Sequence, residues 1–436
     1  MPSQQTIGHL EAFIKILSDA HERDDLKYKA LKDISENFEE LTSSHAYTPL
    51  LDNLLRAFLK LLQETSPQFI AENNTLQLRK LMLELLLRMS TNETVKHYSK
   101  NIQLLLLSIV AMENEDQALI ILKILTDHIK AFRPPFPAEL TSFLMQWKNA
   151  YREMFRYASE EKMFENRRLI TANPSMEDGV MEALQSCFFT TTLTFTNSQS
   201  QGEYTIIPKA TQSVKVLAEM SVFLLFLVQP YRLHLTSEIA ELVPLFVRYI
   251  NISVPKSLRQ NQNYNKELVD EFHNSQVRAL TFIAYTTRQA QFTDLMNENA
   301  SAISNGIKLL FDNLHSDVIN QRRDLLVAIK YFFQCGEMRA NFIPIIPRMT
   351  IDSILLGTSF TSIDQLRFHA YTLLADILHH VRTNLPYKIL THIFFISARN
   401  LHDPSLSPYV QTMYGKLMMN FVEPLLKHEK VGDEPG

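Results

Sequence analysis

Hydrophobic positions along this chain recur with the period of an α-helix. Between Leu10 and Leu17, apolar side chains are spaced i, i+3, i+4 and i+7, which places them on one helical face. The segment from Leu104 to Met112 is apolar nearly all round, so a helix there must be covered on most sides. The pattern therefore predicts an all-α protein with at least two layers of helices. Further stripes follow at 31–41, 51–62, 78–85, 214–228, 242–249, 268–283, 307–314, 325–333, 368–381, 389–396 and 410–426.

Turn and capping residues separate these stripes at regular intervals. Asp24-Asp25 and Asn114–Asp116 carry side chains of the kind that cap helix N-termini. Pro49 is expected in a first helical turn, where its missing N–H is not needed. The prolines between residues 134 and 137 should end a helix. Helices of about 15–20 residues with short connections give a helix pair about every 40–45 residues, the period of HEAT-type arrays. We therefore predict a HEAT-like α-solenoid, a superhelix of antiparallel helix pairs.

One stretch interrupts the helical pattern. Residues 158–209 are irregular, with a β-like alternation between Thr190 and Thr196. Long loops in compact arrays are usually functional or disordered. We predict HEAT-like repeats at 1–157, an irregular and partly disordered insertion at 158–209, continued repeats at 210–427 and a flexible tail at 428–436. The last helix is not followed by the polar capping repeat that a solenoid end needs, so we expect more protein to follow.

Glycine is scarce in this sequence. The chain has 9 glycines among 436 residues, and it contains neither G-x-G nor G-x-S-x-G. Phosphate-binding loops and nucleophile elbows need residues that tolerate positive φ or a close backbone approach, which usually means glycine. The scarcity therefore argues against most enzyme classes. It favours a stack of helices that presents a binding surface.

Charge and cysteine content narrow the function classes further. The formal net charge of −4 lacks the clustered basic excess of a dedicated nucleic-acid binder, so direct nucleic-acid binding is not expected. Cys187 and Cys335 give neither a disulfide framework nor metal-ligand spacing. We interpret both as small buried side chains in a reducing compartment.

No membrane or secretory segment is expected. The N-terminus lacks the basic-then-apolar profile of a signal peptide. The longest apolar run, Val222–Val228, is far shorter than the roughly 20 residues that span a bilayer. The sequence thus predicts a soluble intracellular protein without a membrane partner.

Histidines are numerous but do not form a metal-binding pattern. There are 14 of them, yet H-E-x-x-H and Cys/His ligand spacings are absent. His379 and His380 are adjacent, so on a helix their side chains point about 100° apart and cannot bind one ion together. We interpret them as one histidine packed against Leu378 and Val381 and one in water. No catalytic residue, metal, cofactor or small-molecule substrate is predicted.

Short strings spread along the chain resemble one known family. They occur in a consistent order and spacing over nearly the whole sequence, whereas 158–205 departs from the family pattern. Together they are similar to the N-terminal region of the TRRAP family, very large pseudokinases related to the phosphatidylinositol-3-kinase-like kinases. The strings are Ile34–Ser44, Leu76–Leu81, Thr91–Glu93, Phe132–Pro135, Ile206–Pro208, Val216–Glu219, Tyr264–Leu268, Ser353–Gly357, Leu374–Arg382 and Gln411–Met413.

This resemblance implies a HEAT-like superhelix at the start of a giant scaffold. Such scaffolds belong to nuclear histone acetyltransferase assemblies of the SAGA and NuA4 types, and they receive transcription activators at promoters or damaged chromatin. The implied partners are subunits of those complexes and acidic amphipathic activation domains. The chain lacks the rest of the solenoid, the FAT region and the pseudokinase. We therefore expect a fragment, an incomplete gene model or a short isoform.

Three residues are candidates for partner contact. The exposed member of the pair His379 and His380, together with Arg382, would suit an acidic partner.

Two other function classes stay open at this point. A karyopherin-like transport or trafficking adaptor shares the helical texture, and nucleotide-dependent binding to a small GTPase would favour it. An α-helical enzyme would be favoured by a bound metal or a deep pocket lined by paired carboxylates.

Overall fold

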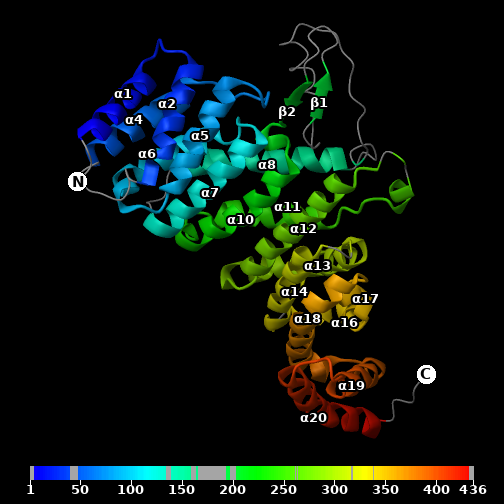
Figure 1. The fold of residues 1–436 in the computed structure, drawn as a ribbon. Coiled ribbons are helices and arrows are strands. Elements are labelled where there is room, and N and C mark those ends of the chain that lie inside the picture. Colours follow the sequence, from blue (N-terminus) through cyan, green and yellow to red (C-terminus); the bar gives the residue numbers. More distant parts are fainter. Residues whose placement is uncertain are drawn as a thin grey trace. The chain divides into compact units, whose positions relative to one another are not determined.

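The computed structural model divides into two compact units, Met1–Glu238 and Ile239–Gly436 (Figure 1). The structure describes residues 4–39, 48–133, 139–158, 164, 193–196, 203–260, 262, 264–315, 318–336 and 338–431. Both units are built almost entirely of helices over these residues. The predicted all-α, HEAT-like solenoid class is therefore confirmed.

The first unit arranges its helices in two layers. Neighbours within one layer are α1, α4, α6 and α8, and neighbours within the other are α2, α5, α7 and α10. Successive helices thus alternate between layers, as expected for stacked helix pairs. The helices are α1 (Gln4–Ser18), α2 (Asp24–Glu36), α4 (Thr48–Glu64), α5 (Asn74–Arg88), α6 (Ser99–Ile109), α7 (Glu115–Phe132), α8 (Glu139–Ala158) and α10 (Val214–Tyr231), with the 3₁₀ helices η2 (Glu93–Tyr98) and η4 (Ala210–Gln212). The first residues of α11 (Thr236–Ile250), up to Glu238, also belong to this unit.

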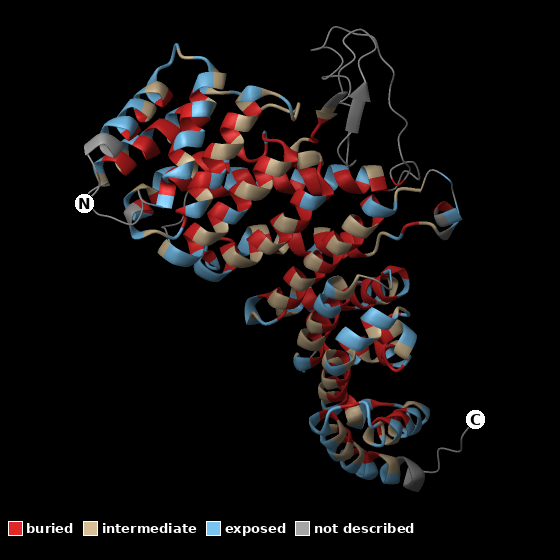
Figure 2. Ribbon diagram, viewed as in Figure 1, coloured by how far each residue is buried: buried red, intermediate tan, exposed pale blue. Residues whose placement is uncertain are grey.

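The predicted stripes form the core of this unit. Leu31 and Ile34 of α2 and Leu54 and Phe58 of α4 are fully buried. Figure 2 shows the buried residues running along the helix faces that meet one another. Burying a stripe removes apolar surface from water, which stabilises the folded state by roughly 25 cal/mol per Å². The hydrophobic spacing read from the sequence therefore identifies the packed faces correctly.

Local capping explains where several helices begin and end. The side chain of Asn114 accepts a hydrogen bond from the backbone N–H of Gln117 and caps α7. Asn73 and Ser213 cap α5 and α10 in the same way, which satisfies N–H groups that lack an intrahelical partner. α7 ends at Phe132, followed by Arg133 in the left-handed region at φ 44°. The predicted capping at Asn114 and the predicted helix end before residue 134 are both confirmed.

A two-stranded antiparallel hairpin precedes α10. β1 (Leu193–Thr196) pairs with β2 (Glu203–Ile206), with Leu193 opposite Ile206. β1 coincides with the β-like alternation seen in the sequence. Residues 159–163, 165–192 and 197–202 of the predicted insertion lie outside the described residues, so its extent and disorder stay a prediction, as do the predicted segment boundaries.

The chain leaving β2 docks on the connections between helices. The backbone N–H of Ile207 donates to the carbonyl oxygen of Phe69 (2.9 Å), and that of Ala210 donates to the backbone carbonyl oxygen of Glu113 (2.8 Å). In return, the N–H of Glu115 donates to the carbonyl oxygen of Pro208 (2.8 Å). These bonds hold the segment before α10 against the α4–α5 connection, the α6–α7 connection and the start of α7.

A buried ion pair lies beside this docking segment. Nη2 of Arg79 on α5 donates to Oε1 of Glu113, and both side chains are 0% exposed. Nη1 of Arg79 also donates to the carbonyl oxygens of Leu62 (3.1 Å) and Thr65 (2.7 Å) at the end of α4. Burial raises the pKa of Glu113, whereas the charge of Arg79 and its hydrogen bond oppose that shift. The guanidinium therefore keeps the carboxylate ionised more readily than burial alone would allow.

Removing the guanidinium should destabilise the first unit. We expect Arg79→Met to lower the free energy of unfolding by about 3–5 kcal/mol, because it leaves a buried carboxyl and two carbonyl groups unpaired. Without Arg79 the folded-state pKa of Glu113 rises further above its unfolded value. The folded state then binds the proton more tightly, so stability should fall as pH rises above 4.5, the ordinary pKa of a glutamate.

Urea titrations at several pH values test this expectation. Arg79→Met combined with Glu113→Gln should recover part of the loss and abolish the added pH dependence. A single variant as stable as the parent protein at pH 8 would contradict the role given to this pair.

A second buried ionisable group lies within α7. The side chain of His128 is 1% exposed and packs edge-on against Phe132, with ring centroids 5.5 Å apart. Neither ring nitrogen has a hydrogen-bond partner among the described residues. Burial lowers the pKa of His128 from 6.5 to about 4, and Asp127 opposes the shift.

This depressed pKa predicts a loss of stability in acid. Between pH 6.5 and 4 the unfolded chain binds the proton and folded His128 does not, so stability is intact above this window and falls through it. The contribution amounts to about 3 kcal/mol. Chemical unfolding across this pH range should show a shallower decline for His128→Leu than for the parent. Parallel curves for the two proteins would refute the assignment.

The second unit also has a layered order of helices. α12, α14, α18 and α20 are successive neighbours, α13 contacts α15, η7 and α17, and α19 packs on α20. After the part of α11 from Ile239, its helices are α12 (Lys266–Thr286), α13 (Thr293–Asn313), α14 (Ile319–Gln334), α15 (Arg339–Phe342), α16 (Ile346–Met349), α17 (Asp352–Leu355), α18 (Phe360–Val381), α19 (Tyr387–Leu401) and α20 (Pro408–Val431), with the 3₁₀ helices η5 (Lys256–Gln260), η6 (Ala290–Phe292), η7 (Ile343–Ile345) and η8 (Arg382–Asn384).

One of the few glycines allows two helices to approach closely. A Cβ atom at Gly306 of α13 would lie 2.7 Å from Cδ1 and Cγ1 of Ile250, at the end of α11. Ile250 is fully buried, so it has little room to move. By contrast, a Cβ at Gly8 in α1 would meet nothing within 4 Å. Only the first of these glycines is required by packing.

These two positions should respond oppositely to alanine. Alanine improves helix propensity by about 1 kcal/mol, but overpacking a core costs about 1–3 kcal/mol. We expect Gly306→Ala to destabilise the protein by about 1 kcal/mol and Gly8→Ala to stabilise it slightly. Ile250→Val, which removes the clashing Cδ1, should recover part of the loss. Equal stabilisation by both alanines in thermal melts would show that the contact at Ile250 is not limiting.

Candidate partner-binding surfaces

The predicted contact residues lie at the C-terminal end of α18. His379 is exposed, and Arg382, which follows in η8, is partly exposed. Nη1 of Arg382 donates to the carbonyl oxygen of His379 and lies 3.4 Å from Nδ1 of the same residue. Nη1 of Arg339 donates to the carbonyl oxygen of His380 (3.2 Å). Cationic groups in this position cap the last carbonyls of a helix and suit its dipole. The structure thus brings His379 and Arg382 together, and their role in partner binding stays a prediction.

His380 differs from its neighbour. Its side chain is 35% exposed, and Nε2 lies 3.8 Å from Oδ1 of Asp376, which also pairs with Lys330 at 2.7 Å. Burial lowers the pKa of His380, opposed by Asp376 and reinforced by Arg339, His379 and Lys330. The ring therefore carries a positive charge less readily than an ordinary histidine does. His379 is solvated, as expected of one member of the pair, whereas His380 is only partly buried and lies beside Asp376.

Among the described residues, no group of three or more His, Cys, Asp or Glu side chains is placed to hold a metal ion. Cys335 is a free thiol and is half-buried, so the prediction of a buried side chain was wrong. It follows the last residue of α14, where packing is incomplete. Cys187 lies outside the described residues.

α10 is the only described helix that is long and apolar enough to cross a membrane by length and composition. In this protein, however, 61% of its span is buried. Leu217, Phe223 and Leu227 pack into the interior of the first unit. A core helix covered on most sides meets the same criteria, so this feature is weak evidence for a membrane span.

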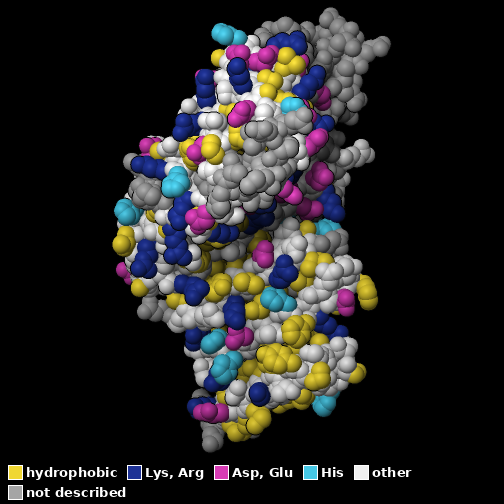
Figure 3. All heavy atoms as spheres, turned by 60° about the vertical axis from the view of Figure 1, so that its left-hand side comes forward, with side chains coloured by type: hydrophobic (Ala, Val, Ile, Leu, Met, Phe, Trp, Pro, Cys, Tyr) yellow, Lys and Arg dark blue, Asp and Glu magenta, His cyan; other side chains and the backbone are white. Residues whose placement is uncertain are grey.

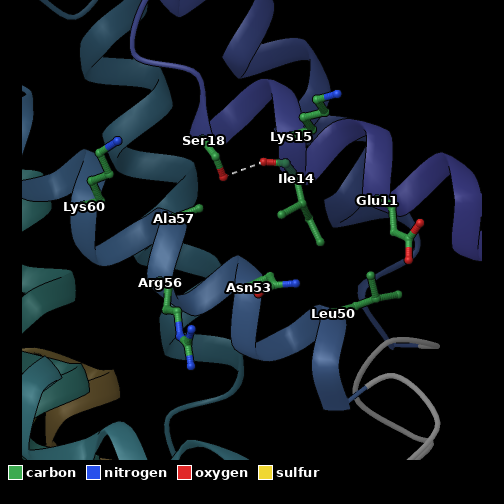
Figure 4. A pocket seen from close by; sticks show the side chains of 9 residues that line it. All are labelled: Glu11, Ile14, Lys15, Ser18, Leu50, Asn53, Arg56, Ala57 and Lys60. Carbon is green, nitrogen blue, oxygen red and sulfur yellow. Dashed lines mark hydrogen bonds between the residues drawn. The ribbon is translucent and has the colours of Figure 1, made fainter.

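A groove between α1 and α4 combines an apolar floor with basic sides (Figure 4). Its volume is about 440 Å³, within the range of about 300–1,000 Å³ usual for ligand sites. Ile14, Leu50 and Ala57 form the floor, and each is at most 7% exposed. The remaining lining residues are Glu11, Lys15, Ser18, Asn53, Arg56 and Lys60. Sequence reasoning missed this groove because the stripes do not reveal which helices are neighbours.

A second basic hollow, of about 390 Å³, lies between α7 and α10. Nζ of Lys130 sits 4.0 Å from the ring centroid of Phe226, a cation–π contact. Arg133, Gln229 and Pro230 complete much of its lining. Both hollows of the first unit therefore place cations next to apolar side chains.

Large apolar side chains are exposed on the helices at the end of the second unit. Phe395 is 68% exposed and Met419 is 77% exposed. The rings of Phe368 and Tyr409, both exposed, lie 6.3 Å apart. Figure 3 shows hydrophobic side chains gathered in its lower part, where these helices lie. Exposed apolar groups at this density are typical of contact surfaces. Phe360, Val422 and Leu426 belong to the same set.

Known proteins resemble this chain along nearly its whole length. Residues 268–434 match the family model described as the Tra1 HEAT repeat central region. The chain is 33% identical over 426 residues to Transcription-associated protein 1 of Caenorhabditis elegans, covering 97% of this chain and 10% of that protein. It is 34% identical over 411 residues to the Transformation/transcription domain-associated protein of Homo sapiens, covering 94% and 10%.

A more distant relative carries a more specific name. The chain is 24% identical over 429 residues to the SAGA complex/NuA4 acetyltransferase complex subunit TRA1 of Saccharomyces cerevisiae, covering 92% of this chain and 11% of that protein. The chain thus spans about a tenth of the length of the relatives it matches. These matches extend across the two helical units and confirm the resemblance carried by the sequence strings. With its HEAT-type helical architecture, the chain belongs to the TRRAP family.

Proposed function

We propose that this chain is a non-catalytic scaffold segment of a nuclear transcription co-activator that links activators to histone acetyltransferase complexes. The observation that carries the proposal is similarity over 92–97% of the chain to proteins named as transcription-associated and as a SAGA and NuA4 subunit. A helical array of this kind works by presenting surface. Subunits of those complexes are therefore the first partners we assign to it.

Acidic amphipathic activation domains are the second class of partner. Such segments are disordered when free and carry apolar side chains among acidic ones. The basic hollows of the first unit and the exposed aromatic side chains of α18–α20 offer complementary chemistry. Direct nucleic-acid binding is not part of the proposal, because the net charge is −4 and no basic excess is available to release counterions from phosphates.

A transport adaptor of the karyopherin type is not favoured. The relatives over nearly the full chain carry names that refer to transcription. The succession of amphipathic helices that suggested a transport adaptor is common to many solenoids. It therefore does not outweigh the similarity over the whole chain.

Affinity purification of the endogenous protein that contains this segment tests the proposal. Quantitative mass spectrometry should recover acetyltransferase and other chromatin-complex subunits with it. Recovery of transport receptors or their cargo, without acetyltransferase subunits, would overturn the assignment.

Charge reversal at α18 tests the predicted contacts. We expect Arg382→Glu to reduce capture of an acidic activation domain about two- to fivefold, because a partly exposed ion pair contributes up to about 1 kcal/mol. Lys388→Glu changes the exposed surface of α19 by the same charge and serves as control. Adding His379→Glu should deepen the effect. Equal capture by all variants in pull-downs would remove these residues from the binding surface.

A further inference from the structure

The groove between α1 and α4 has a specific chemical pattern. Three cationic side chains, Lys15, Arg56 and Lys60, line it together with one anionic side chain, Glu11. The cations come from both helices, and the buried floor lies between them (Figure 4). A ligand that fits must therefore be apolar on the side that enters and negatively charged at its flanks.

Two of these cations are available to a ligand. Lys15 and Arg56 are exposed, and neither makes a hydrogen bond or ion pair with any residue that the structure describes. Nζ of Lys60 lies 3.8 Å from Oε1 of Glu64, and both side chains are about half exposed. Such an exposed pair is weak and readily exchanged. All three cations can thus turn toward an incoming carboxylate at little cost.

The dimensions of the groove indicate the form of the ligand. Its lining on α4 extends from Leu50 to Lys60, a helical rise of about 15 Å. That length corresponds to about three turns of a helix laid along the groove. Helix-in-groove recognition uses apolar anchors spaced i, i+3 or i+4 and i+7, which span about 10 Å of helix and therefore fit within the groove.

We propose that the α1/α4 groove is the docking site for one short amphipathic helix whose apolar face is flanked by Asp or Glu. The apolar face would pack on Ile14, Leu50 and Ala57, and the acidic flanks would pair with Lys15 and Arg56. The identification of this partner class rests on the proposed function, whereas the site follows from the charges and shape of the groove. Phosphate ligands fit less well, because the apolar floor and Glu11 offer them nothing.

A fluorescently labelled 14-residue peptide is the probe for this proposal. It carries Leu or Phe at i, i+3, i+4 and i+7 and Glu at the flanking positions, and it is titrated into the intact 436-residue chain. Polarisation should report saturable binding that weakens as salt is raised. Lys15→Glu combined with Arg56→Glu should weaken binding at least about tenfold at low salt.

Two further variants separate the groove from general charge effects. Lys29→Glu combined with Lys32→Glu makes the same charge change at exposed positions of α2 and should retain binding within about twofold. Asn53→Trp leaves the charge unchanged and fills the groove with an indole ring, and it should also abolish binding. Circular dichroism melts verify that every variant is folded before its binding is compared.

The outcomes decide the proposal independently of the co-activator assignment. Undiminished binding to the Lys15/Arg56 variant, or to Asn53→Trp, would overturn it, as would no binding at all. A scrambled peptide of the same composition should bind at least about tenfold more weakly. If it or duplex DNA binds as tightly as the designed peptide, the groove is a general polyanion surface and the proposal fails. Recovery of acetyltransferase subunits with the endogenous protein would be unaffected by any of these results.

Discussion

The buried contact between Arg79 and Glu113 constrains the first unit more strongly than any apolar contact. Hydrophobic burial is not directional, so many helix arrangements could cover the same stripes. A charge withdrawn from water costs several kcal/mol unless it finds its partner. Arg79 pairs with the carboxylate of Glu113 before α7 and donates to two carbonyl groups at the end of α4. The Arg79 side chain therefore ties α5 to two other segments, and the backbone carbonyl oxygen of Glu113 accepts a separate hydrogen bond from the N–H of Ala210.

The sequence predicted what depends on local spacing and missed what depends on distant partners. The stripe containing Leu31 and Ile34, the cap at Asn114 and the end of α7 follow from neighbouring residues, and the structure contains all three. Arg79 lies between Leu78 and Leu81 in the sequence and resembles any solvated charge there. It is buried because the folded chain brings Glu113, 34 residues away in the sequence, into contact with it. Hydrophobic periodicity carries no information about such a long-range contact.

The same limit applies to the candidate surfaces. The exposure of His379 follows from its place on the helix, whereas the use of Arg382 and Arg339 to cap α18 depends on where that helix ends and what packs beside it. The α1/α4 groove depends on two stripes lying next to each other. Its cations flank apolar positions in both helices, a signal visible in the sequence only after the helices have been paired.

Weak binding at these surfaces is consistent with the proposed scaffold function. An exposed ion pair contributes at most about 1 kcal/mol, and ordering a disordered acidic segment costs free energy on binding. A groove with three cations over a small apolar floor therefore supports a weak complex with fast exchange. The hollow beside Lys130 and Phe226 in the same unit has similar chemistry. Two weak sites on one chain raise the effective concentration of a partner carrying two acidic segments. A partner with two acidic segments can then occupy both sites although each site alone binds weakly, and an array of repeated helices can supply several such sites.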